Sequence, residues 1–360
     1  MHAGERLFIS KLKSAPIDNR SLRWVPLLLA IGLGGCSTYY GQLAVGQLTL
    51  LSQREPVSAI VEDPSTEPQL RQRLSAALQA RAFASSDLGL PDNGSYQVYA
   101  DIRRPFVVWN VFATEEFAVT PLTHCFPIAG CVAYRGYYQD GRARGAAALL
   151  KAKGYDTLVA GVQAYSTLGW FDDPLLSSML RWDDERLAGL IFHELAHQQL
   201  YVPDDTAFNE SYASFVEREG MRQWRASRGL PATGDAAREQ YADLSRLVLD
   251  TRERLAALYA SDLDEREMRA AKAEEFSRMR RLYRQLRDGP WNRDTRFDRW
   301  MAQPLNNASL VPFGLYDGWV PSFAVLFEQA GGDWQRFHAR VEALGDLSSD
   351  ERKQLLDSLR

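Results

Sequence analysis

Apolar residues in the middle of the chain recur with the period of an α-helix. The clearest run has apolar side chains three and four positions apart, at Leu187, Leu190, Ile191 and Leu195. This spacing places them on one helical face, and Asp183 or Asp184 offers a side-chain N-cap before them. We expect a helix here that buries this face.

Other stretches also have helical spacing. Residues 37–55 and 65–84 predict two helices, the second starting near Ser65 and Thr66. Residues 236–288 combine alternating charges with apolar inner positions, and so predict a long antiparallel helical hairpin with solvated outer faces. A partner-binding arm is the alternative interpretation of this hairpin. The inner positions are Leu244, Leu247, Leu255, Leu258, Met268, Phe276, Met279 and Leu282.

The stretch from residue 96 to residue 138 has a different character. Runs of β-branched and aromatic residues bounded by Pro and Gly predict strands at 98–102, 107–113 and 131–138. A small sheet therefore precedes the helix around Leu190. The predicted fold class is α+β and mostly helical, with no linker or repeat that divides residues 36–360.

The predicted helix carries the sequence His193-Glu194-Leu195-Ala196-His197. Residues four apart share a helical face, so both imidazoles can bind one ion while Glu194, one step round, reaches a water on that ion. HExxH in a helix is the pattern of zinc peptidases. The alternative is a pair of surface helices that carry these residues by chance.

A third zinc ligand is expected from the segment 208–217, which reads FNESYASFVE. A catalytic zinc keeps three protein ligands and one position for water. Pro203 ends the first helix, and an antiparallel turn brings Glu210 to the height of His197. Glu217 competes but lies about 10 Å further along the helix axis. We therefore expect one Zn²⁺ on His193, His197 and Glu210.

The first 35 residues have the order of a secretory signal. Basic residues precede an apolar run over 24–33, too short for a comfortable membrane span, and small residues follow. Leu33-Gly34-Gly35-Cys36 resembles the lipobox of bacterial lipoproteins, which implies cleavage before Cys36 and a lipid anchor on its thiol. Ser37 then favours the outer membrane, facing the periplasm. A plain signal peptide or an uncleaved anchor is the alternative.

Charge and cysteine usage agree with export. Residues 1–35 carry five basic and two acidic side chains, so residues 36–360 have a net charge of −7 against −4 for the whole chain. A nucleic-acid partner is not expected. With Cys36 lipidated, Cys125 and Cys131 remain, and an even pair in an oxidising compartment favours a disulfide. Buried free thiols are the alternative; a zinc site there lacks ligands.

HELAH followed by NESYA resembles the gluzincin clan of metallopeptidases. The closest likeness is to a bacterial family of putative zinc aminopeptidases that occur as predicted lipoproteins. The shared segments are the lipobox Cys, CFPxAGC, AYSTLGWF, FHELAHQ and FNESYASFVE. Only twelve residues separate His197 from Glu210, fewer than in thermolysin-like gluzincins, so their substrate-binding architecture is not carried over.

The resemblance implies a zinc aminopeptidase in the bacterial cell envelope, with Glu194 as general base and a Tyr that stabilises the oxyanion. Tyr134, Tyr137 and Tyr316 are the candidates for that Tyr, with Tyr134 and Tyr316 ahead because each lies in a segment that resembles the family pattern. Ser214 stands where some relatives carry an acid that orients a His. The loop 164–174 is expected in the cleft wall. The strand edge at 129–133 is expected either to pair with a peptide substrate or to pair within the sheet.

Two other functions stay open at this point. One is an envelope endopeptidase or quality-control protease with the same zinc chemistry. The other is a non-catalytic lipoprotein scaffold that keeps a structural zinc. Glu194 favours an enzyme, because a structural site does not need a base beside the metal.

Overall fold

The computed structural model describes residues 25–126, 130–164, 166–167, 169, 171–231, 236–313 and 318–359. The chain forms two compact units, Met1–Leu48 and Thr49–Arg360. The described part of the first unit belongs to the helix α1 (Val25–Ser52), which contains the predicted apolar run and Cys36. The side chain of Cys36 lies outside the described ones. None of the described helices combines the length and apolar character needed to cross a membrane.

The second unit is α+β and mostly helical, which confirms the predicted fold class. Its described strands form three separate groups rather than one sheet. The first has the order β1 (Arg54–Pro56), β2 (Val98–Ala100) and β8 (Leu175–Leu176). The second has the order β6 (Tyr134–Tyr137), β3 (Val108–Thr114) and β7 (Asp156–Val162). The third is the hairpin of β4 (His124–Phe126) and β5 (Gly130–Val132).

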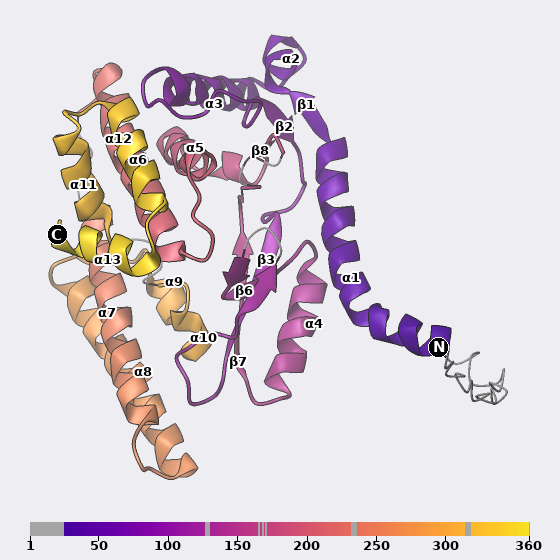
Figure 1. Ribbon diagram of the computed structural model, residues 1–360, viewed down its shortest axis with the longest axis vertical. Helices are drawn as coiled ribbons and strands as arrows, with labels where there is room; N and C mark the ends of the chain where they lie inside the picture. Colours follow the sequence, from indigo (N-terminus) through magenta and orange to yellow (C-terminus); the bar gives the residue numbers. More distant parts are fainter. Residues whose placement is uncertain are drawn as a thin grey trace, which may run out of the picture. The chain divides into compact units, whose positions relative to one another are not determined.

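The antiparallel β6-β3-β7 sheet is covered on both faces. Successive side chains of a strand point to opposite faces, so Val111 and Phe112 of β3 pack in different directions. Val111 contacts Ala143 and the rest of α4 (Asp140–Lys151). Phe112 packs with Ala308 and α10 (Asn307–Leu310), as the flanking helices in Figure 1 show. Helices on both sides explain why the strands read as apolar runs.

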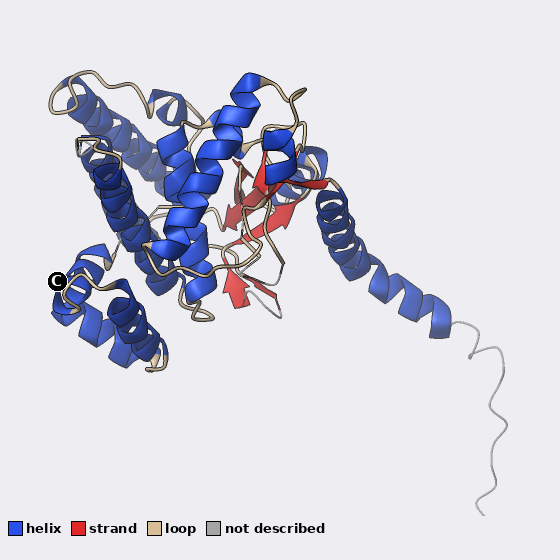
Figure 2. Ribbon diagram, turned by 90° about the horizontal axis from the view of Figure 1, so that it is seen from above, coloured by secondary structure: helices blue, strands red, loops and turns tan. Residues whose placement is uncertain are grey.

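A second layer consists of helices alone, and Figure 2 shows them gathered beside the strands. Its centre is the antiparallel pair α5 (Asp184–Gln199) and α6 (Thr206–Ser227). The helix α3 (Pro68–Ser86) packs on α5, and α11 (Val320–Gln329) packs on α6. The helices α12 (Trp334–Gly345) and α13 (Ser349–Ser358) complete this side of the unit. The pair α5 and α6 is therefore held between other helices on both sides.

The stretch predicted as a long hairpin forms α7 (Ala236–Tyr259) and α8 (Glu265–Asp288). Their facing sides bury Leu244, Leu255, Phe276 and Met279. Salt bridges such as Arg254 to Glu275 lie on the solvated side. Figure 1 shows the hairpin extending away from the other helices of the unit. The remaining short elements are α2 (Val57–Glu62), α9 (Asp298–Met301) and the 3-10 turn η1 (Met179–Arg181).

Several boundaries differ from the sequence-based expectation. The helix expected over 37–55 ends at Ser52, because Arg54–Pro56 pairs with β2 as the strand β1. The run 131–138 is two strands, because β5 pairs with β4 while β6 pairs with β3. The helix expected from Ser65 begins instead at Pro68, in the first-turn position that proline favours. Thr66 Oγ1 donates to the Ile60 carbonyl, so this residue closes the preceding turn. The division of the strands comes from pairing with different segments, which local spacing does not contain, whereas the start of α3 follows a local preference of proline.

Candidate metal centre

The helix α5 carries both histidines of the HExxH sequence. It begins as expected, because the Asp183 side chain accepts a hydrogen bond of 2.8 Å from Arg186 N. Its buried face contains Leu187, Ile191 and Leu195. The opposite edge presents His193 and His197, one turn apart.

The turn between α5 and α6 is compact and tightly bonded. The side chain of Asn209 donates to Val202 O at 2.7 Å and accepts from Val202 N at 2.8 Å. Asp205 caps α6 by accepting from Phe208 N at 3.1 Å, and Arg352 binds the same carboxylate. These bonds fix the start of α6, and they place Glu210 of its second turn opposite the histidines.

His193, His197 and Glu210 converge on one point. The two Nε2 atoms are 3.2 Å apart, and Glu210 Oε2 lies 3.4 Å from the first and 3.7 Å from the second. A tetrahedral zinc with bonds of about 2.0–2.2 Å separates its ligand atoms by about 3.3–3.5 Å. The three atoms therefore match the spacing and the donor set that zinc requires. Among the described residues, these three form a group that could hold a metal ion.

The charges at this centre are strongly coupled. Burial works against ionisation of Glu210, but hydrogen bonds to His193 and His197 prevail and lower its pKa to about 2. Burial likewise works against protonation of His193. The carboxylates of Glu210 and Glu217 nevertheless hold the pKa of His193 well above its usual value. The site is thus built to hold positive charge next to Glu210.

Glu194 lies at the same centre without being part of the triangle. Its side chain is half-buried, and this burial raises its pKa. The positive imidazoles act in the other direction, and Asp173 and Glu210 add to the rise. A carboxylate with a raised pKa near a metal position suits proton transfer.

Glu217 binds the outer nitrogen of His193, with Oε2 3.1 Å from Nδ1. It therefore contacts His193 on the side away from Glu210, which is the position of a group that orients a histidine ring rather than of a third ligand. Gly189 makes room for it, since a Cβ at Gly189 would lie 3.2 Å from Glu217 Oε1. Sequence reasoning expected an orienting group without finding it, although Glu217 stands two helical turns beyond Glu210. Among the described residues, the buried Nδ1 of His197 has no hydrogen-bond partner.

Gln198, which follows His197 in α5, connects this helix to two loops by hydrogen bonds. Its amide accepts from Asn93 Nδ2 at 2.8 Å and donates to Ser95 Oγ and to Asp173 Oδ2, both at 3.2 Å. Asp173 is buried and also accepts from Thr167 N at 2.9 Å. The described part of the loop 164–174 is thus fixed against the metal helix by polar contacts.

Of the two tyrosines expected first to stabilise an oxyanion, Tyr134 and Tyr316, the structure describes Tyr134 alone. Tyr134 is in β6 with its ring 5.4 Å from that of Phe112. Tyr316 lies outside the described residues. Two other tyrosines lie near the acidic groups of the site. Burial raises the pKa of Tyr201, and the charge of Glu210 raises it further. Burial and then the charge of Glu194 raise the pKa of Tyr96 in the same way. The place of Tyr201 four residues after His197 was a usable sequence signal; Tyr96 had none.

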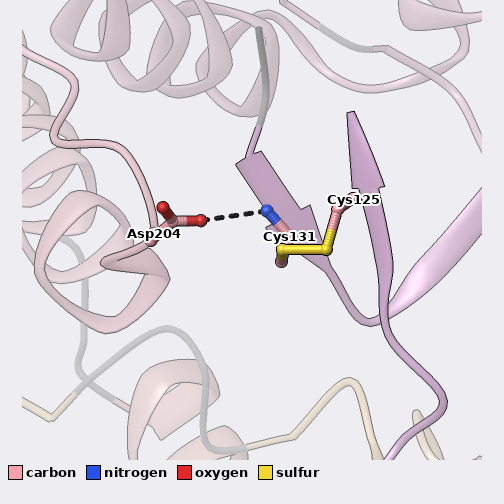
Figure 3. Close-up of a disulfide and its surroundings, with 3 residues drawn as sticks. All are labelled: Cys125, Cys131 and Asp204. Atoms are coloured by element: carbon pink, nitrogen blue, oxygen red, sulfur yellow. Dashed lines mark hydrogen bonds between the residues drawn. A yellow bond between two sulfur atoms is a disulfide. The ribbon is translucent and has the colours of Figure 1, made fainter. Parts of the chain in front are cut away.

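Cys125 and Cys131 form a disulfide that joins β4 to β5 (Figure 3). Cys131 N donates a 3.0 Å hydrogen bond to Asp204 Oδ1, and Asp204 belongs to the turn between α5 and α6. The hairpin is therefore docked on the segment that connects His197 to Glu210. The strand edge at 129–133 was expected to pair either with a peptide substrate or within the sheet. Its Cys131 N–H is bonded to Asp204, so a peptide strand cannot use this donor while that bond is made.

The model of a protein family described as "Putative aminopeptidase" matches residues 38–356. This range includes all the residues of the metal centre and the disulfide hairpin. No curated protein and no solved structure matches the chain significantly.

Proposed function

We propose, since the chain belongs to the putative aminopeptidase family, that it hydrolyses peptide bonds at one zinc ion held by His193, His197 and Glu210. The observation that supports this most directly is the convergence of two Nε2 atoms and one carboxylate oxygen within 3.7 Å of one another. Two imidazoles and a carboxylate, with Glu194 beside them, form the ligand set and base of a catalytic rather than a structural zinc site.

A bound zinc would supply the Lewis acidity that lowers the pKa of a coordinated water and polarises the scissile carbonyl. Glu194 accepts the proton of the attacking water and returns it to the leaving amine. The buried surroundings raise the pKa of Glu194, which favours this double role. Glu217 keeps the His193 ring in place through Nδ1, and Gln198 fixes the adjacent loops.

The family name favours removal of N-terminal residues over internal cleavage. The proposal for location is a lipid anchor on Cys36, which holds the enzyme on the outer membrane facing the periplasm. Replacement of Cys36 by Ala should then release the enzyme from the membrane fraction. An enzyme that remains bound would contradict the anchor but not the peptidase.

The experiment uses the purified chain from Ser37 with and without a chelator. Aminoacyl chromogenic substrates, the same substrates with a blocked amine, and an unstructured protein are supplied in parallel. We expect cleavage of the free-amine substrates, loss of activity with chelator, and recovery with zinc.

Two variants separate chemistry from folding. Glu194→Gln should bind zinc as the wild type does and lose activity about 10²–10⁴-fold. Glu219→Gln, on α6 and paired with Arg222 rather than with a histidine, is the matched control and should keep full activity. A Glu194→Gln protein that cleaves as well as the wild type would end this proposal. Cleavage of the protein substrate alone would instead favour an endopeptidase.

A further inference from the structure

Tyr96 combines three features that rarely occur together. Its side chain is only 2% exposed, its backbone has a left-handed φ of 63°, and among the described residues its buried hydroxyl has no hydrogen-bond partner. A bulky residue at positive φ is an outlier, and buried tyrosine hydroxyls usually find a partner. Packing alone therefore gives no reason for a tyrosine at this position.

The surrounding structure forces Tyr96 into this conformation. Its N–H donates to Asp173 O at 2.7 Å, and the hydroxyl of Ser95 accepts from Asp173 N at 3.1 Å. Arg81 is buried and donates to the carbonyls of Ser95 and Pro91, each at 2.9 Å. Strained residues persist where neighbouring bonds over-determine them, and such residues concentrate at functional sites.

The same contacts place Tyr96 beside the face of α5 that carries Glu194. Gln198 follows Glu194 by one helical turn, so the two side chains share a face. Gln198 donates to Ser95, the neighbour of Tyr96, and to Asp173, the backbone partner of Tyr96. Burial first, and then the charge of Glu194, raise the pKa of Tyr96 well above its usual value. The phenol therefore stays protonated and keeps an O–H to donate.

We infer that Tyr96 is a positioning residue for Glu194. Its hydroxyl donates a hydrogen bond to the Glu194 carboxylate in the working site, directly or through one water, and so holds the rotamer from which that carboxylate reaches the attacking water. This inference rests on the proposed role of Glu194. It explains the strain and the unpartnered hydroxyl together, because both serve to present one O–H donor to a buried carboxylate.

The first test compares Tyr96→Phe with Tyr99→Phe. The Tyr96 change removes only a hydroxyl that has no partner among the described residues, so the melting temperature of the metal-free protein should stay equal or rise. Loss of an orienting partner should lower kcat about 10–100-fold while KM and zinc stoichiometry stay unchanged. Tyr99, whose hydroxyl bonds Ser177, is the matched control and should show the reverse: a lower melting temperature with kcat unchanged.

A second test needs no activity. Urea unfolding in the presence of zinc is measured for wild type, Tyr96→Phe, Glu194→Gln and the double variant. If the hydroxyl and the carboxylate interact, the two single changes do not add in the double variant. Additive changes, or a Tyr96→Phe enzyme with wild-type kcat, would overturn the inference. If the wild type cleaves no peptide, the peptidase proposal fails, and the unfolding cycle still decides whether Tyr96 and Glu194 are coupled.

Discussion

Glu217 Oε2 lies 3.1 Å from His193 Nδ1, on the side of the imidazole opposite to the nitrogen that faces Glu210. With the Nδ1 proton donated to Glu217, the lone pair of Nε2 is directed toward the position where a metal would bind. The contact with Glu217 therefore favours one orientation and one tautomer of the His193 ring.

Replacement of Glu217 by Ala should weaken zinc binding about 10–100-fold, because the His193 ring loses its orienting acceptor. Glu217→Gln keeps an acceptor without the charge and should fall between that variant and the wild type. Competition with a chromogenic chelator measures the affinity. Unchanged zinc affinity in Glu217→Ala would show that packing alone orients the ring.

Stability of the metal-free protein should depend on pH through Glu210 and His193. The pKa of Glu210 is lowered from 4.5 to about 2, so its stabilisation is present above pH 4.5 and is lost as pH falls toward 2. The pKa of His193 is raised above 6.5, so its stabilisation is present below pH 6.5 and is lost as pH rises through the raised value. Both contributions are present between pH 4.5 and 6.5.

The measurement is the difference in melting temperature between wild type and Glu210→Gln across pH, with chelator present. We expect the largest loss inside that window. With zinc in place of chelator, the loss of melting temperature caused by Glu210→Gln should instead grow as the pH rises, since metal binding needs neutral imidazoles. A difference that does not vary with pH would mean that Glu210 is not coupled to the histidines.

Removal of the disulfide should destabilise the second unit and loosen the turn between α5 and α6. Cys125 and Cys131 are six residues apart, and closing so short a loop contributes about 2 kcal/mol in the chain-entropy account. Urea unfolding of the Cys125→Ser/Cys131→Ser variant measures this loss. Asp204→Asn is the control, because Asn keeps an acceptor for Cys131 N and tolerates the positive φ of 63°. A larger loss in Asp204→Asn would mean that the carboxylate charge matters more than the covalent link.

Close packing of α6 depends on Gly220. A Cβ there would lie 2.7 Å from Leu88 Cδ1 and 3.0 Å from Phe192 Cδ2, and Phe192 precedes His193 in the chain. Gly220→Ala should therefore lower the free energy of unfolding by about 1–3 kcal/mol through overpacking. Gly145→Ala in α4, where nothing lies within 4 Å, should instead raise it by about 0.5–1 kcal/mol. Chemical unfolding of both variants measures the contrast, and equal effects would argue against a tight contact at Gly220.

Local patterns were sufficient for the elements with strong periodicity. The apolar spacing around Ile191, with Asp183 or Asp184 as the cap, predicted α5 and its start, and the structure shows Asp183 as the cap. The α+β class followed from the period change near residue 96. The separation of β5 from β6 was not predicted, because both have the same strand-like composition and only their different partners divide them. Likewise the role of Glu217 required knowledge of how α6 lies against α5.

The sequence by itself determined which residues can bind a metal, since four-residue spacing puts His193 and His197 on one helical face whatever surrounds the helix. It also indicated Glu210, because the interruption at Pro203 forces a short turn. Only the tertiary structure decided that Glu217 binds the outer nitrogen of His193 and that the buried Tyr96 lies near enough to Glu194 for its charge to raise the Tyr96 pKa. Those relationships join segments far apart in the chain. Their geometry comes from helix packing and from hydrogen bonds of Arg81, Gln198 and Asp173, which the local spacing of residues does not predict.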